Sequence, residues 1–131
     1  MGLDMYVYSV DKSDIMKSKT KKHTLVPKKG ASPTEIHYWR KHHDLHGLME
    51  EIYRSKGGEE ESFNCIALPL DEFDLDDIEA RIDERSLPET TGFFFGNNPP
   101  DDESKKEDLA VIARLRDELK QGKIVFYYSW W

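Results

Sequence analysis

The hydrophobic residues of this chain alternate with polar ones at its two ends and recur at helical spacing between them. Over residues 2–10, Leu3, Met5 and Val7 fall on one side of an extended segment, with polar and aromatic residues on the other. Period-two alternation with aromatic and β-branched residues predicts a strand. Residues 123–130 (KIVFYYSW) have the same character. Both ends are therefore expected to be strands.

A first helix is expected over residues 33–56. Ser32 is a suitable N-cap, Pro33 suits the first helical position, and Glu35 completes a capping box. Gly57 and the glycine after it supply a stop. The apolar positions that recur at helical spacing in this segment are Tyr38, Leu45, Met49 and Ile52.

Two further helices are expected, over about residues 71–85 and 102–121. Acidic residues in the first turns of the former suit the helix dipole, and Gly122 ends the latter. Residues 23–27 and 64–70 are expected to be short extended segments, the second of them a buried strand.

Strands that bracket helices at both ends of the chain favour the α+β class. We expect a small antiparallel or mixed sheet in which the N- and C-terminal strands pair, with about three helices packed on it. A length of 131 residues fits one globular domain over residues 1–131.

The formal net charge is -7, and an acidic surface repels phosphate backbones. Double-stranded nucleic acid is therefore not an expected partner. The lysine-rich segment 17–29 is a local exception, interpreted as a solvated loop and edge strand. We find no secretory signal and no apolar run of membrane-spanning length, so a cytoplasmic location and no membrane partner are expected.

Four motifs occur in order along the chain: MGLDMY, YWRK followed by His46, GFFFG, and YSW. In these motifs the chain resembles a family of small uncharacterised proteins encoded mostly by tailed phages and prophages. The chain departs from that pattern at Leu48 and Met49, where members often have an aromatic pair. The resemblance implies a phage origin, and hence the cytoplasm of a host cell, and brings no settled activity. The matching positions are Gly2–Tyr6, Tyr38–Lys41, His46, Gly92–Gly96 and Tyr128–Trp130.

The GFFFG segment, residues 92–96, is interpreted as a buried strand end. Its far side, with Trp39 and Trp130, is expected to line a shallow aromatic cleft. On the expected first helix, Trp39 and His46 share one flank beside the core stripe. The alternative is that this flank only seals the edge of the core. The candidate ligand-binding residues are Asp4, Tyr6, Trp39, Arg40, His46, Phe94 and Trp130.

No metal, cofactor or catalytic residue is predicted. His42 and His46 have the i, i+4 spacing of metal ligands, but no HExxH motif surrounds them, and a third ligand would have to come from Asp4 or an acidic loop. Cys65, the only cysteine, could pair with His46, yet its apolar surroundings predict a buried, inert thiol. Fingerprints of nucleotide-binding loops and hydrolase elbows are missing from the sequence.

Two hypotheses of different classes follow. The first is a non-enzymatic, phage-type binding protein that sequesters or inhibits a host factor, for example a defence component, through the aromatic cleft. Its partner would be a host protein, or a small nucleotide-like ligand held between aromatic rings and Arg40. The second is a small enzyme acting on a nucleotide or phosphorylated metabolite, with His46 as general base. A deep pocket that joins His46 to Asp4 would favour the enzyme. Mimicry of double-stranded DNA by the acidic runs is a third reading, which the basic segment 17–29 weighs against.

Overall fold

The structure is a computed structural model of the chain, and it describes residues 3–40, 42–84 and 102–131. Within these ranges the chain forms four strands, three α-helices and one short 3₁₀ helix. In order along the sequence they are β1 (Asp4–Val10), η1 (Lys12–Asp14), β2 (Thr34–Arg40), α1 (His43–Ser55), β3 (Leu68–Leu70), α2 (Glu72–Asp83), α3 (Asp102–Lys120) and β4 (Ile124–Trp130).

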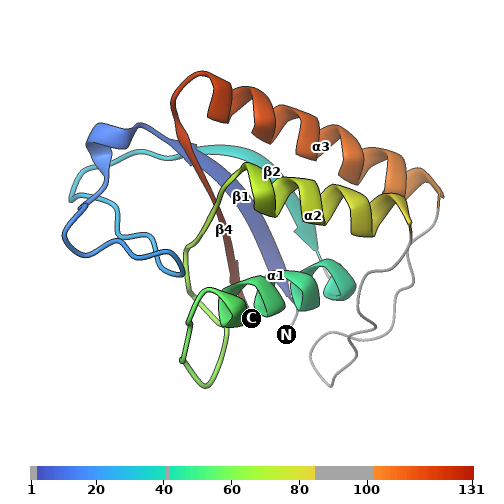
Figure 1. The fold of residues 1–131 in the computed structure, drawn as a ribbon, viewed down its shortest axis with the longest axis horizontal. Helices are drawn as coiled ribbons and strands as arrows, with labels where there is room; N and C mark the ends of the chain where they lie inside the picture. The colour runs from blue at the N-terminus through green and yellow to red at the C-terminus, as the bar shows by residue number, and fades with distance from the viewer. Residues whose placement is uncertain (1–2, 41, 85–101) are drawn as a thin grey trace.

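The four strands form one antiparallel sheet in the order β2-β1-β4-β3. The strands from the two ends of the chain lie side by side at its centre, with Asp4 opposite Trp130 and Tyr6 opposite Tyr128. The three helices lie on one side of the sheet (Figure 1). The fold is therefore α+β, and the predicted pairing of the first and last strands is confirmed.

The local sequence explains where α2 and α3 begin and end. The Asp71 carboxylate accepts a hydrogen bond from the backbone N–H of Asp74, and the Asp74 carboxylate accepts one from the backbone N–H of Asp71, each over 2.9 Å. This reciprocal capping box satisfies two donors that a helix start leaves unpaired. Gly122 follows α3 with a φ of +84°, which glycine adopts without steric cost. Both helices are confirmed close to their predicted bounds.

The predicted helix over residues 33–56 is wrong in its first half. Thr34–Arg40 forms the edge strand β2, and α1 begins at His43 with His42 as its N-cap. Ile36, Tyr38 and Trp39 belong to a run of β-branched and aromatic side chains, which fit a pleated surface well. Pairing with β1 therefore overrides the helix-start pattern that precedes this run.

The two short extended segments are also corrected. Residues 23–27 form no regular strand; the pairing there consists of isolated bridges, Ile15 with Pro27 and Lys21 with Thr24. The strand predicted over 64–70 is reduced to Leu68–Leu70. Cys65 has a φ of +61°, outside the extended region, and is exposed rather than buried. The expectation of a buried thiol is therefore wrong.

The main core lies between the sheet and the helices, and a smaller cluster lies on the other face. In the main core, Met5 and Val7 of β1 pack with Leu45, Leu75 and residues of α3, all of them fully or almost fully buried. The smaller cluster joins Val10 and Phe126 of the sheet to two residues of the segment that follows β1. These two residues are Ile15 and Leu25. The helices thus cover one face, and only a loop covers part of the other.

Candidate functional site

Six aromatic residues lie on the sheet face away from the helices. Because directly opposed residues share a face, the register places on it every second residue of β1 and its partners in β2 and β4. We call these six residues the aromatic strip. They are Tyr6, Tyr8, Tyr38, Phe126, Tyr128 and Trp130.

The rings of the aromatic strip contact one another across the strands. The ring centroid of Tyr6 lies 5.0 Å from that of Tyr38 and 5.7 Å from that of Tyr8, and Tyr8 lies 5.2 Å from Phe126. These distances fall in the range where aromatic pairs attract beyond the burial of their area. Tyr38 is 40% exposed and Trp130 is 49% exposed. The strip is therefore an ordered aromatic surface that solvent or a ligand can reach.

The end of the aromatic strip near Tyr38 carries opposite charges. The Tyr38 hydroxyl donates a hydrogen bond to the Asp4 carboxylate, and Arg40 lies opposite Asp4 in the register. The Asp4 carboxylate raises the pKa of Tyr38 by accepting this bond. The phenol therefore stays neutral at physiological pH, and its ring keeps a neutral face for stacking.

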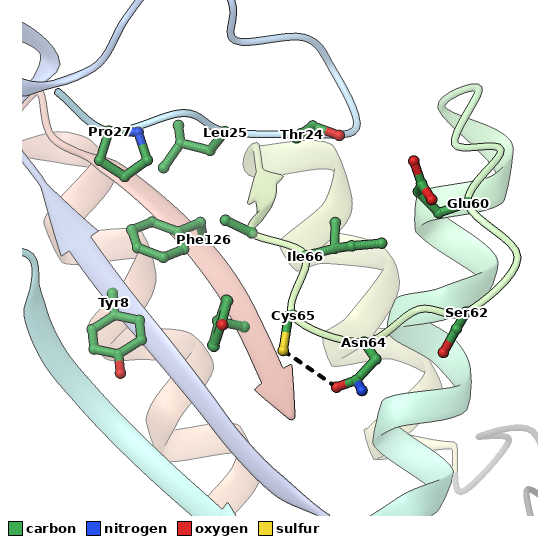
Figure 2. A pocket seen from close by; sticks show the side chains of 12 residues that line it. Tyr8, Thr24, Leu25, Pro27, Glu60, Ser62, Asn64, Cys65, Ile66 and Phe126 are labelled. Carbon is green, nitrogen blue, oxygen red and sulfur yellow. Dashed lines mark hydrogen bonds between the residues drawn. The ribbon is translucent and has the colours of Figure 1, made fainter. Parts of the chain in front are cut away.

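The other end of the aromatic strip forms the floor of a hollow of about 650 Å³ (Figure 2). Tyr8, Phe126 and Tyr128 provide the aromatic floor, and Leu25 and Pro27 form one wall. The opposite wall comes from the loop between α1 and β3. That wall is made by Glu60, Ser62, Asn64, Cys65, Ile66 and Ala67. A volume of this size is typical of sites for small ligands or for parts of larger ones.

Cys65 faces this hollow from the loop wall. Its backbone N–H donates a hydrogen bond to the carbonyl of Ser129 over 2.8 Å, which holds the loop against β4. The thiol of Cys65, together with partial burial, raises the pKa of Tyr128. Burial, with a smaller effect of the Glu35 carboxylate, raises the pKa of Tyr8. Both phenols of the floor are therefore neutral at physiological pH, and they can donate hydrogen bonds to a ligand.

The sheet divides the predicted ligand-binding residues between its two faces. Asp4, Tyr6, Arg40 and Trp130 lie on the open face, as the register requires. Trp39 does not join them, because it alternates with Tyr38 in β2 and points toward the helices. The predicted flank that Trp39 and His46 share on one helix is therefore wrong.

The remaining predicted residues do not meet at one cleft either. His46 is buried in α1 on the helix side of the sheet. Phe94 and the rest of the GFFFG segment lie outside the described residues. The candidate site thus keeps four of the predicted residues and loses the proposed link to Trp39 and His46.

Trp39 is held in the core by a buried carboxylate. Its Nε1 donates a hydrogen bond to Oδ1 of Asp108 over 2.8 Å, and the Nε2 of His42 lies 2.6 Å from Oδ2 of the same carboxylate. The Nδ1 of His42 accepts the backbone N–H of Leu45. His42 has thus one structural partner on each ring nitrogen, and it fastens the start of α1 to α3.

His46 belongs to a separate buried cluster. Its Nδ1 lies 2.7 Å from the hydroxyl of Tyr127, and its ring stacks on Phe63 and meets Trp131 edge to face. Burial lowers the pKa of His46 to about 4 and raises the pKa of Tyr127 well above its usual value. His46 is therefore neutral at physiological pH.

The two histidines that the sequence pairs at metal-ligand spacing have different partners. His42 binds Asp108, and His46 binds Tyr127. In the ranges that the structure describes, no three His, Cys, Asp or Glu side chains gather as a metal site would need. Cys65 and His46 lie on opposite sides of the sheet, so they form no thiolate pair.

Sequence reasoning missed four residues of the site: Tyr8, Tyr38, Phe126 and Tyr128. The signal for three of them was present, since alternation placed Tyr8 with Tyr6, and the predicted pairing of the end strands brings Phe126 and Tyr128 to the same face. Tyr38 was missed because its segment was expected to be helical.

Comparisons with protein-family models, with curated proteins and with solved structures find no match to this chain. The resemblance to phage-encoded proteins therefore stays a prediction. Among the helices of the described residues, none combines the length and the apolar character needed to cross a membrane.

Proposed function

We propose that this chain is a non-enzymatic binding protein that engages its partner through the aromatic strip and the adjoining hollow. The observation that carries the proposal is the one-sided fold: helices cover one face of the sheet, and the other face presents stacked rings, two of them 40% and 49% exposed. Exposed aromatic residues gathered on one ordered surface are typical of recognition sites. The resemblance to phage-encoded proteins makes a factor of an infected host cell the expected partner.

The alternative, an enzyme with His46 as general base, receives less support. The base would have to work with Arg40 and Asp4, but these two residues lie on the open face and His46 lies under the helices. The ring of His46 is enclosed by Phe63, Tyr127 and Trp131. A general base must come within hydrogen-bond reach of its substrate, and no described hollow contains His46.

The proposal is tested by removing exposed rings from two different surfaces. Tyr38→Ala and Trp130→Ala each shorten the aromatic strip. Phe73→Ala removes a ring that is 83% exposed on α2, at the other side of the fold, and is the matched control. Each tagged variant is used to capture macromolecules from a lysate of cells that express the chain, and the captured species are identified by mass spectrometry.

We expect the strip variants to lose a species that the wild type and Phe73→Ala retain. Thermal melts establish that each variant is folded. If Phe73→Ala loses the partner while the strip variants keep it, the binding surface lies on the helices and the proposal is wrong.

A further inference from the structure

The lysine-rich segment between β1 and β2 is fixed against the open face of the sheet. Ile15 and Leu25 of this segment pack on Val10 and Phe126. The backbone N–H of Leu25 donates to the carbonyl of Ala67 over 2.8 Å, which attaches the segment to the loop before β3. The segment therefore occupies a defined place beside the hollow.

The segment also folds back on itself. The N–H of Met16 donates to the carbonyl of Val26, and the N–H of Lys28 donates to the carbonyl of Asp14, each over 2.7 Å. Thr20 adds a side-chain contact, since its Oγ1 accepts the N–H of Val26 over 3.0 Å. These bonds limit how far the lysines of the segment can move away from the aromatic strip.

Residues 11–29 contain seven lysines against two aspartates, in a chain whose net charge is -7. All seven lysines are exposed, and none makes an ion pair with another described residue. They are Lys12, Lys17, Lys19, Lys21, Lys22, Lys28 and Lys29. Many of the acidic residues lie instead on α2 and α3, at the other side of the sheet. The fold thus separates the charges by layer.

The hollow joins these two features. Leu25 and Pro27 of the lysine-rich segment form its wall, and Tyr8, Phe126 and Tyr128 form its floor. Lys28 and Lys29 follow Pro27 directly and are exposed. A ligand with a planar ring in the hollow would therefore carry its next charged groups toward unpaired ammonium groups.

We propose that the partner is single-stranded nucleic acid, with bases placed on the aromatic strip and phosphates placed along the lysine-rich segment. This inference rests on the proposed function and names the partner of the same surface. Unpaired bases can stack on aromatic side chains while cationic groups follow the backbone, and such stacking tolerates any sequence. A duplex is a poorer fit, because its bases are enclosed in the helix and the acidic layer repels it.

An acidic peptide fits the observations less well. Its carboxylates would satisfy the lysines, but it has no need of a floor made of three aromatic rings. Glu60 in the loop wall and Glu35 on β2 would also repel carboxylates that enter the hollow itself. A nucleic acid strand can place an uncharged base there and keep its phosphates outside, over the lysines.

The test is fluorescence anisotropy with a labelled 12-nucleotide single strand of mixed sequence, with the corresponding duplex and with a poly-glutamate peptide as competitor. We expect the single strand to bind more tightly than the duplex, and its affinity to fall linearly with salt on logarithmic scales. We expect poly-glutamate to compete poorly. No binding of the strand at tens of micromolar protein in low salt, or equal binding of strand, duplex and peptide, overturns the inference.

Two sets of variants locate the contact. Lys28→Gln with Lys29→Gln removes two charges beside the hollow, and Lys106→Gln with Lys120→Gln removes two exposed charges from α3 as the matched control. We expect the first pair to lower the affinity at least about fivefold and to flatten the salt dependence, and the second pair to leave both unchanged. Equal effects of the two pairs contradict the assignment.

The aromatic contribution is measured with Tyr8→Leu, which removes the ring and keeps an apolar side chain. A stacked base contributes about 5- to 150-fold in affinity, so a loss of at least about tenfold is expected in a variant whose melt remains cooperative. If the strand does not bind at all but Tyr38→Ala and Trp130→Ala still lose a captured partner, this inference fails and the proposed function stands.

Discussion

Trp39 donates a hydrogen bond from its Nε1 to Oδ1 of Asp108, and this contact joins the edge strand β2 to helix α3. Asp108 is 3% exposed and also contacts Nε2 of His42 at the start of α1. One carboxylate thus connects three elements that are distant in sequence. The indole that the sequence suggested for a binding flank is part of the core.

The first prediction concerns this carboxylate. Asp108→Ala leaves two buried donors, on Trp39 and His42, without an acceptor, and each orphaned donor costs about 1–3 kcal/mol. We expect the free energy of unfolding in urea to fall by several kcal/mol. Glu107→Ala is the control, since Glu107 is exposed beside it and contacts only His37 at 3.2 Å. A loss below about 1 kcal/mol for Asp108→Ala would contradict the structural role.

The second prediction compares two neighbours in β2. Trp39→Ala removes a buried indole and should lower the free energy of unfolding by about 3–5 kcal/mol, as large as the effect of a core change such as Leu45→Ala. Tyr38→Ala, one residue earlier, removes a ring that is 40% exposed, and should cost much less. Urea unfolding of both variants measures the difference. Similar losses would mean that the two residues do not lie on opposite faces.

The third prediction concerns pH. Burial holds the pKa of His46 at about 4 in the folded protein, against about 6.5 in an unfolded chain. The unfolded state therefore binds more protons below pH 6.5. Stability from this group is complete above that pH and is lost as the pH falls toward 4, by about 3 kcal/mol in all.

The measurement for His46 is the free energy of unfolding between pH 7.5 and 4, compared with His46→Gln. Glutamine can still bond the Tyr127 hydroxyl but does not titrate. We expect a shallower decline for the variant over this range. Parallel curves for the two proteins would show that His46 does not couple to folding.

The fourth prediction is that the thiol of Cys65 reacts with a thiol reagent in the native protein. Cys65 is exposed at the rim of the hollow, so reaction should not require unfolding. The count of thiols modified per chain, with and without urea, checks this. Modification only in urea would place the thiol in the interior, as the sequence alone suggested.

The fifth prediction concerns the backbone at Cys65, whose φ of +61° is costly for a residue with a Cβ. Cys65→Gly removes that cost, and Cys65→Ala retains it. After allowance for the greater freedom of glycine in the unfolded chain, we expect the glycine variant to be more stable than the alanine variant by ~0.5–1 kcal/mol. The reverse order in thermal melts would show that the backbone there is not left-handed.

The sequence by itself determined the fold class, the two end strands and the helices α2 and α3. These features rest on local signals: period-two alternation in Asp4–Val10 and Ile124–Trp130, a capping box at Asp71, and a glycine stop at Gly122. Such signals depend on a residue and its near neighbours. They therefore remain readable in a single sequence.

Only the tertiary structure decided what residues 34–40 form. A helix-start pattern and a β-rich run overlap in this segment, and the choice depends on whether β1 is available as a partner. That choice moved Trp39 into the core and Tyr38 onto the open face. The candidate site depends on this decision.

The hollow also required three dimensions. Its floor comes from the two ends of the chain, and its walls come from the lysine-rich segment and the loop before β3. No local pattern relates Leu25 to Ala67 or Cys65 to Ser129, because backbone hydrogen bonds across long separations depend on how the whole chain packs. Composition predicted a basic segment, and packing placed it beside aromatic rings.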